Sequence, residues 1–266
     1  MLVLLILPAT VLADLEVHFL DVGQGDCAII LCDGEAMVID GGPKSASDKV
    51  YSYIRDTLGL KFIDFVVSTH PHVDHVSGLA AVLNAAPVES IYSLVMNWES
   101  KAFRNMLKYA MKQGAQISVP KDLDYFHVGG AEVTILLCMP EMIKEGRTND
   151  ASIVLRIDYG ETSFLFTGDA EEYAEYTLED YYQSYLKADV LKVAHHGSEY
   201  SSNEKFLGLV RPEYAVISVG KKNRYGHPHQ ETLDRLNAVG AKILRTDELG
   251  TIVFRSDGSL LSLVQP

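Results

Sequence analysis

Three histidines and one aspartate lie within six residues of the segment STHPHVDHVSG, residues 68–78. Side chains two positions apart in an extended segment point the same way, so His70 and His72 can hold one metal ion. Asp74 and His75 follow a bend into a helix and can reach a neighbouring ion. Imidazole and carboxylate ligands suit zinc, and also manganese or iron. The alternative is a histidine-rich surface loop with Asp74 as a helix cap; HxHxDH after an apolar strand favours metal binding.

Two later segments offer further ligands at the ends of predicted strands. Asp169 in FLFTGDAE follows one strand and begins a helix, where on its own it would be an acid stabilised by the helix dipole. His195 and His196 in VLKVAHHGS follow another strand, where alone they could form a turn. Because these segments and residues 68–78 all follow strands, we expect them to meet at one edge of the fold.

The elements that position these residues are predicted from apolar alternation and turn residues. Helices are expected over 48–58, with Ser47 as its N-cap and Gly59 at its end, and over 78–86, 170–186, 203–209 and 230–239. Strands are expected over 15–20, 27–31, 36–39, 62–67, 132–137, 152–157, 163–167, 190–193, 214–219, 242–244, 251–254 and 260–264. The first three strands read as an antiparallel meander. Two such halves of strands and helices predict an α/β/β/α sandwich, and the absence of a linker-like composition predicts one domain.

Composition limits the classes of partner. The 266 residues are 47% hydrophobic and 22% charged, so the chain can bury a substantial core. A net charge of -13 argues against the broad basic surface of nucleic-acid-binding proteins. A nucleic-acid substrate would need help from bound cations or from the short basic run of Lys221, Lys222 and Arg224, which otherwise is a solvated loop. The three cysteines are an odd number, so at least one is free.

Residues 1–13, MLVLLILPATVLA, form an apolar run that is too short to span a bilayer. Val11 and Ala13 resemble the small-residue pattern of a secretory cleavage site, although no positive residue precedes the run. We predict a weak or truncated signal peptide over 1–13, a mature domain over 14–266 that begins near Asp14, and a secreted or cell-surface protein with no integral membrane span. The alternative is a buried first strand and a cytoplasmic protein.

The motifs together resemble the metallo-β-lactamase fold. Within it they are most similar to the hydrolase domain of ComEC-type DNA-uptake proteins and their stand-alone secreted relatives, including phosphorylcholine esterases. The matching segments are HFLDVGQGDCAII (18–30), VIDGG (38–42), STHPHVDHVSG (68–78), NDASIVLRIDYG (149–160), FLFTGDAE (164–171), LKVAHHGS (191–198) and SVGKKNRYGHPH (218–229). HxHxDH is typical of the superfamily, and the combination of VGQGD, HHGS and YGHPH is typical of this branch.

The resemblance implies a four-layer α/β/β/α hydrolase with two divalent metal ions, zinc being favoured and manganese the alternative. A hydroxide bridging the two ions would attack the substrate. Asp40 would orient a ligand histidine, or else is a turn acid. The implied ligands are His70 and His72 for one metal, Asp74 and His75 for the other, Asp169 as the bridge, and His196, with His195 beside it, completing the second site.

One departure from the superfamily pattern affects the first metal site. Most members place a further histidine between HxHxDH and the bridging aspartate, and here the corresponding stretch reads RTNDAS, residues 147–152. We expect Asn149, Asp150 or water to fill the gap. His127 lies earlier and is interpreted as a strand or loop residue.

Two glycine-containing motifs remain. In YGHPH, His227 follows a strand and is predicted to be catalytic, by donating a proton to the leaving group or contacting a phosphate; the alternative is a rigid loop fixed by Pro228. In VGQGD, Gly23 and Gly25 form a tight turn, and Asp26 either caps that turn or approaches the metals.

We therefore expect a metal-dependent hydrolase of phosphodiester bonds, with a phosphoester substrate that is either nucleic acid or a phosphorylated envelope polymer. Asp74 and His227 are the predicted catalytic residues. A carboxylic ester or lactone hydrolase is the alternative enzyme, and a metal-binding module without turnover is the alternative of another class. The presence of Asp74, His75 and Asp169 argues against the last, because catalytic decay would erode such residues first.

Overall fold

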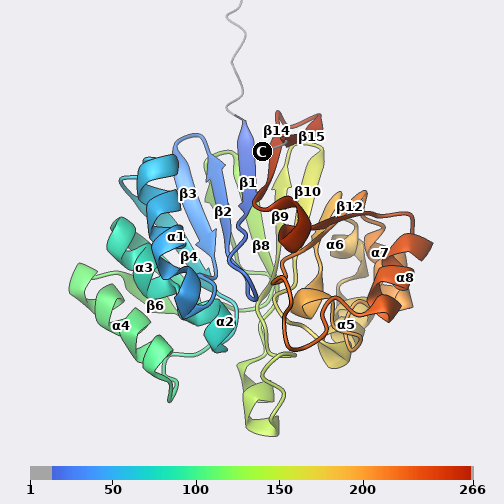
Figure 1. The fold of residues 1–266 in the computed structure, drawn as a ribbon, viewed down its shortest axis with the longest axis horizontal. Helices are drawn as coiled ribbons and strands as arrows, with labels where there is room; N and C mark the ends of the chain where they lie inside the picture. The colour runs from blue at the N-terminus through green and yellow to red at the C-terminus, as the bar shows by residue number, and fades with distance from the viewer. Residues whose placement is uncertain (1–13, 265–266) are drawn as a thin grey trace, which may run out of the picture.

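The computed structural model describes residues 14–264, so the prediction of a leader over 1–13 lies outside the described residues. Two sheets pack face to face, and helices cover both outer faces (Figure 1), as in the predicted four-layer sandwich. The order in the first sheet is β15-β14-β1-β2-β3-β4-β5-β6. Its strands are β1 (Leu15–Phe19), β2 (Ala28–Cys32), β3 (Glu35–Ile39), β4 (Ile63–Ser68), β5 (Val88–Ser93), β6 (Gln116–Ser118), β14 (Ile252–Ser256) and β15 (Leu261–Val264).

The second sheet has the order β13-β12-β11-β10-β9-β8-β7. Its strands are β7 (Tyr125–Val128), β8 (Ala131–Leu137), β9 (Val154–Tyr159), β10 (Thr162–Phe166), β11 (Val190–Lys192), β12 (Tyr214–Ile217) and β13 (Lys242–Arg245). The α-helices are α1 (Ser47–Ser52), α2 (Val73–Val76), α3 (Leu79–Ala85), α4 (Lys101–Gln113), α5 (Glu172–Tyr181), α6 (Gln183–Leu186), α7 (Glu204–Val210), α8 (Gln230–Ala238) and α9 (Thr246–Leu249). Shorter helical turns are η1 (Lys44–Ala46), η2 (Tyr53–Thr57), η3 (Pro140–Glu145) and η4 (Ala194–Gly197).

Strand direction explains why the predicted ligands meet. The strands β1, β2 and β3 are antiparallel, as the meander predicted, whereas β3, β4 and β5 run parallel. In the second sheet β10, β11 and β12 also run parallel. Carboxyl ends of parallel strands lie at one edge of a sheet, so the segments after β4, β10 and β11 emerge together. These are the segments that carry the metal-site motifs.

Two apolar clusters hold the layers together. One fills the space between the sheets, where the Phe19 ring of the first sheet stacks on the Phe166 ring of the second with 5.4 Å between centroids. The other lies beneath α1, α3 and α4, around buried Phe103 and Ile54. Cys27, Cys32 and Cys138 are all free thiols. Within residues 14–264, the helices are all too short or too polar to cross a bilayer.

The predicted elements are confirmed in kind, with several differences. The expected helix over 48–58 begins at Lys44 and consists of η1, α1 and the π-helical η2, so Ser47 lies inside a helical segment and makes no capping hydrogen bond with its side chain. The expected helix over 170–186 breaks at Tyr182 into α5 and α6. The region 88–128 received no prediction, although Ser100 caps α4 by accepting from the Phe103 amide and Gly114 ends it in the left-handed conformation.

A glycine contact fixes the loop after β3 against the loop around α2. The Gly41 amide donates to the His75 carbonyl at 2.8 Å, and the Gly78 amide donates to the Gly42 carbonyl at 2.9 Å. A Cβ atom on Gly78 would overlap the carbonyl oxygen of Gly41. Backbone contact at this point therefore sets the distance between Asp40, which precedes Gly41, and His75.

We predict that Gly78→Ala lowers the free energy of unfolding by about 1–3 kcal/mol or more, because the new methyl group forces the two loops apart. The metal content of the purified variant should fall as well, since Asp40 and His75 separate. Gly208→Ala in α7 is the matched control. Its Cβ meets no atom within 4 Å, so the better helix propensity of alanine should stabilise the protein by about 1 kcal/mol. Thermal unfolding and elemental analysis measure both effects, and an unperturbed Gly78→Ala protein would contradict the prediction.

Candidate metal centre

The ligand-bearing loops have unusual backbone conformations where they leave the strands. Asp40 after β3 and both His195 and His196 after β11 have positive φ angles of 57°, 46° and 55°. Such angles are uncommon for residues other than glycine and concentrate at functional sites. Here they turn successive side chains toward one point between the sheets.

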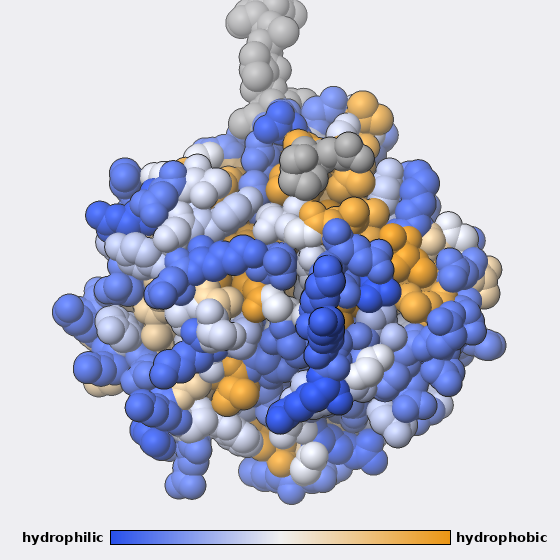
Figure 2. Space-filling view, viewed as in Figure 1, coloured by the Kyte–Doolittle hydropathy of each residue, from blue (hydrophilic) through white to orange (hydrophobic). Residues whose placement is uncertain are grey.

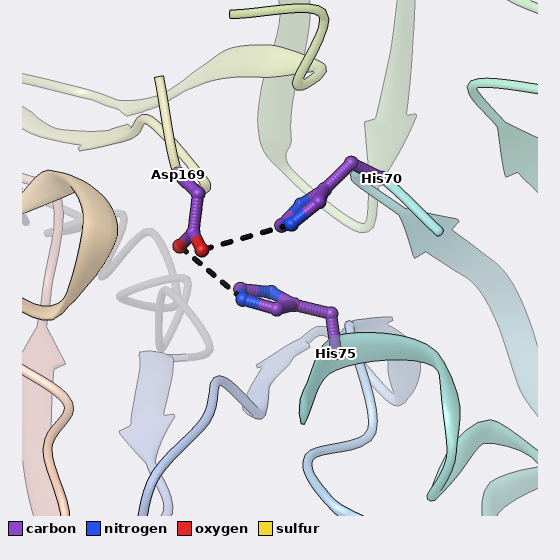
Figure 3. Close-up of side chains that lie close together, drawn as sticks. All are labelled: His70, His75 and Asp169. Atoms are coloured by element: carbon purple, nitrogen blue, oxygen red, sulfur yellow. Dashed lines mark ion pairs between the residues drawn. The ribbon is translucent and has the colours of Figure 1, made fainter. Parts of the chain in front are cut away.

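Asp169 lies at the centre of the predicted ligands (Figure 3). Its Oδ2 atom is 3.6 Å from His70 Nε2, and its Oδ1 atom is 3.2 Å from His75 Nε2. His196 Nε2 lies 3.8 Å from the same Oδ1 atom and 3.6 Å from Asp74 Oδ2. His70, His75, His196 and Asp169 are all at most 2% exposed. The structure thus places Asp169 between two sets of nitrogen and oxygen ligands.

The two remaining predicted ligands lie nearer the surface. His72 Nδ1 is 3.1 Å from His70 Nε2, so their two rings converge as expected from the spacing. His195 Nε2 is 3.9 Å from Asp169 Oδ2, while its Nδ1 lies 2.9 Å from a Glu171 oxygen. His196 is the buried member of the pair and faces Asp74, whereas His195 lies at the rim.

Unpartnered buried atoms test whether the residues fit a metal. Among residues 14–264, His75 Nε2, His196 Nε2 and Asp169 Oδ1 are buried without a hydrogen-bond partner. Leaving a buried polar atom unpaired costs about 1–3 kcal/mol, and metal coordination would satisfy all three. His70, His75 and Asp169 form one group whose ligand atoms lie within 4.8 Å of one another, and Asp74, His75 and His196 form another. The residues fit divalent cations.

The charges of the cluster are strongly coupled in the metal-free protein. Burial opposes a charge on Asp169, but His75, His196 and then His70 outweigh it and hold the Asp169 pKa well below its usual value. Burial likewise opposes a charge on His75, yet Asp169 and Asp40 raise the pKa of His75 well above its usual value. Against the same burial penalty, Asp169 and Asp26 raise the pKa of His196 to about 9. The metal-free site therefore holds protons that a cation must displace.

Asp40 lies where an orienting acid is needed. Its Oδ2 atom is 2.8 Å from His75 Nδ1 and accepts from the Thr69 hydroxyl at 2.7 Å, while Oδ1 accepts from the Thr69 amide at 2.9 Å. Fixing Nδ1 directs Nε2 of His75 toward Asp169. This is the usual arrangement of a carboxylate behind a metal-ligating histidine.

A second orienting pair was not predicted from the sequence. Asp26 is buried, and its Oδ2 atom is 2.5 Å from Lys192 Nζ, while its Oδ1 atom is 3.3 Å from His196 Nδ1. Lys192 Nζ also donates to the Val193 carbonyl at 2.9 Å, and His196 Nδ1 lies 2.9 Å from the Ser218 carbonyl. Of the two roles considered for Asp26, the approach to the metal site is the one the structure supports. A lysine within an apolar strand, LKVA, was the available signal.

The stretch that lacks the expected histidine places Asn149, and not Asp150, in the wall of the cleft over the candidate ligands. Asn149 lines the cleft over the site, and its Nδ2 donates to Glu171 at 2.9 Å while its Oδ1 is buried without a partner among residues 14–264. Asp150 instead accepts from the Ala174 amide at 3.0 Å and pairs with Arg147 at 3.6 Å. Of the three candidates for the missing ligand, which were Asn149, Asp150 and water, Asp150 has its carboxylate bound to the start of α5 and does not line the cleft. His127 is an exposed residue of β7, as interpreted.

A cleft of about 370 Å³ opens over the cluster. Its wall includes His227, whose ring is stacked on Tyr225 at 5.7 Å and lies 5.3 Å from the His195 ring. Burial, followed by the neighbouring His195 and His196, lowers the pKa of His227 to about 4. At neutral pH this imidazole is uncharged, so of its two predicted roles the structure favours hydrogen bonding over proton donation.

The basic run beside His227 lies outside the cleft. Arg224 is exposed and covers the Tyr225 ring, with 4.9 Å between the guanidinium carbon and the ring centroid. Lys221 and Lys222 are exposed, and neither is among the residues that line the cleft. These three residues are solvated, which is the alternative that the sequence offered for them.

The fold and the ligand arrangement together define a class of protein. Residues 20–221 match the family described as the metallo-beta-lactamase superfamily, and the chain belongs to it. Over 257 residues it is 31% identical to ComE operon protein 3 of Bacillus subtilis (strain 168), covering 90% of this chain and 33% of that protein. It is also 31% identical to competence protein ComA of Neisseria gonorrhoeae, covering 88% of this chain and 31% of that protein. The chain thus spans about a third of the length of these relatives.

Solved structures show the same fold at low identity. The metallo-beta-lactamase fold protein YhfI from Bacillus subtilis has a TM-score of 0.60 at 12% identity, with 92% of this chain and all of that chain covered. CmlA, a diiron beta-hydroxylase from Streptomyces venezuelae, has a TM-score of 0.61 at 14% identity, with 92% of this chain and 54% of that chain covered. The resemblance stated from the motifs is confirmed in fold and family.

We predict that zinc binding to the metal-free protein at pH 7 releases protons. His75 and His196 have raised pKa values, so they are protonated there and must lose a proton to coordinate a cation. The pKa of His196 is about 9. Below that pH, metal affinity should fall as the pH falls, by about tenfold per pH unit for each proton released. Calorimetry in two buffers of different ionisation enthalpy counts these protons. His127→Ala, which removes an exposed histidine, should leave the count unchanged, and a pH-independent affinity would contradict the prediction.

Proposed function

We propose that this metallo-β-lactamase superfamily hydrolase cleaves phosphodiester bonds, and that its substrate is a nucleic-acid strand. The observation that carries the proposal is the placement of two sets of ligands around Asp169, which lies in the wall of a cleft. The Nε2 atoms of His75 and His196 lie near the Asp169 carboxylate and have no hydrogen-bond partner among residues 14–264. Two cations held there would concentrate positive charge where a phosphate oxygen must lie, despite the net charge of -13.

The relatives support nucleic acid over other phosphoesters. One of them is named as a competence protein, and another, 29% identical over 89% of this chain, is recombination protein 2 of Haemophilus influenzae. A diphosphatase of the PhnP family shares the fold with a TM-score of 0.50 at 16% identity. These names concern the relatives, and they favour phosphate chemistry for this chain.

Each group of residues around the centre would have its own role in hydrolysis. When bound, the cations supply Lewis acidity and lower the pKa of a water molecule. Asp40 holds the His75 ring, and the Ser218 carbonyl, with Asp26 beside it, holds the His196 ring, so that little reorganisation is needed on binding. The neutral His227 imidazole lies in the cleft wall, where it can hydrogen-bond the leaving oxygen.

A screen of metals against substrates tests the proposal. Zinc, manganese and magnesium are combined with single-stranded DNA, bis-p-nitrophenyl phosphate, p-nitrophenyl phosphorylcholine and a lactone. We expect phosphodiester cleavage with zinc or manganese, reduced to background in His72→Ala and Asp74→Ala, and reduced about 10- to 100-fold in Asp40→Asn. Turnover of the lactone alone would replace the proposal with the ester-hydrolase alternative. Bound metal without turnover of any substrate would leave the metal-binding, non-catalytic module, and absence of bound metal would reject the metal centre itself.

We predict that His227→Ala lowers the turnover of single-stranded DNA by about 10², because the leaving oxygen loses a hydrogen-bond donor, while leaving the metal content unchanged. The loss should be smaller with bis-p-nitrophenyl phosphate, because p-nitrophenolate leaves readily without a hydrogen bond. Elemental analysis and steady-state rates measure both quantities, with His127→Ala as the matched control. Loss of metal in His227→Ala would make His227 a ligand, and equal losses on the two substrates would exclude contact with the leaving oxygen.

A further inference from the structure

A second hollow adjoins the metal cleft. It has a volume of about 720 Å³ and lies on the outer face of the first sheet, among α1, α3 and α4, which Figure 1 shows side by side. Val73 and Ser100 line both this hollow and the metal cleft. The two spaces are therefore continuous at the surface.

The hollow exists because one helix face carries short side chains. Its floor is formed by residues spaced at i, i+3, i+4 and i+7, which is the spacing of one helical face. Tyr51 of α1 and Tyr109 of α4 stand at its sides. The floor residues are Ser77, Ala80, Ala81 and Asn84.

A third hollow extends the path away from the metals. It has a volume of about 260 Å³, shares Asn84 and Tyr109 with the second, and reaches Arg55 and Lys112. We call the second and third hollows together the furrow. A linear polymer whose reacting bond lay in the metal cleft would meet the furrow next.

The furrow is basic on an acidic protein. Lys44 and Lys101 line its near part, Arg55 and Lys112 line its far part, and Asp48 is the one acidic residue among those that line it. Within residues 14–264, none of the four cations forms an ion pair with a carboxylate; Arg55 makes a 3.5 Å hydrogen bond to the Ala85 carbonyl. The surface over α1, α3 and α4 is mainly hydrophilic in Figure 2. Unpaired cations along a channel suit a chain of phosphates.

Aromatic rings distinguish nucleic acid from a polyol phosphate. Tyr51 and Tyr109 line the furrow, and Trp98 and the half-exposed Tyr225 line the metal cleft. Proteins that hold single strands combine a positive groove with aromatic faces on which bases stack. A polyol phosphate offers charge and no rings, so it would use the lysines alone.

We propose that the furrow binds the continuation of a single-stranded nucleic acid whose scissile phosphate lies in the metal cleft. Lys44 and Lys101 contact the backbone phosphates nearest the cleft, and Arg55 and Lys112 contact those beyond. This subsite rests on the proposed function. It adds the requirement that a strand be long enough to reach from the metal cleft into the furrow. Affinity comes from phosphates several positions away from the reacting bond.

The test measures binding separately from cleavage. Fluorescence anisotropy is recorded on the zinc-loaded protein with phosphorothioate oligothymidylates of two and of twelve nucleotides, which keep the backbone charge and resist hydrolysis. The wild type should bind the longer strand more tightly. Lys44→Gln/Lys101→Gln should lose most of that gain, and its plot of log K against log salt should be shallower by about 1.4, at about 0.7 per phosphate contact. Lys108→Gln, an exposed lysine of α4 outside the furrow, is the matched control and should retain the wild-type gain.

The outcomes separate the subsite from the proposed function. The furrow would be overturned as a strand site if the double variant kept the wild-type difference in affinity between the twelve- and two-nucleotide strands. It would also be overturned if Lys108→Gln lost as much of that difference as the double variant did. Thermal unfolding must show that both variants are folded. Binding of poly(glycerol phosphate) but of neither oligonucleotide would overturn the assignment to nucleic acid. Length-dependent binding without any hydrolysis of DNA would support the furrow and reject the proposed function instead.

Discussion

The burial of the Asp169 carboxylate among His70, His75 and His196 is the interaction on which the rest of the site depends. An isolated carboxylate at this depth would be costly to desolvate, and its charge is tolerated because protonated imidazoles or cations surround it. The surrounding residues serve that arrangement. Asp40 behind His75 and the Asp26–Lys192 pair behind His196 fix the rings that must face the same carboxylate. The sheet topology brings all of them to one edge.

The chemistry of the centre was readable in the sequence because it is encoded locally. HxHxDH sets four side chains by their spacing alone, and Asp169 and His196 were found because each comes within four residues of the end of a short apolar strand. These two strands were predicted from their apolar residues, which are buried along their whole length. These signals need no knowledge of the tertiary structure.

What the sequence did not reveal depends on contacts between distant segments. Lys192 lies in a three-residue strand, and only its 2.5 Å approach to Asp26, far away in the chain, explains a lysine that is 3% exposed. Asn149 and Asp150 are adjacent in sequence, and the contact of Asp150 with α5 decides which of them faces the cleft. The strands β6 and β7 were missed because they are short and partly exposed. The helix α4 was missed although its serine cap and terminal glycine are local signals. The furrow appears only when α1 and α4 are placed on either side of α3.

The pairing of β1 with β14 shows which edge of the first sheet lies far from the metal loops. Leu15 at the start of β1 lies opposite Ser256 at the end of β14, whereas Phe19 lies opposite Ala28, and Ala28 lies opposite Ile39 beside the metal loops. Leu15, at the start of β1, thus lies at the edge remote from the metal loops (Figure 1), whereas β15 runs back and ends with Val264 opposite Val253. A partner that bound at this remote edge would leave the metal loops uncovered. The cleft over the candidate metal centre would then stay open, and a strand of the kind proposed above could reach it unobstructed.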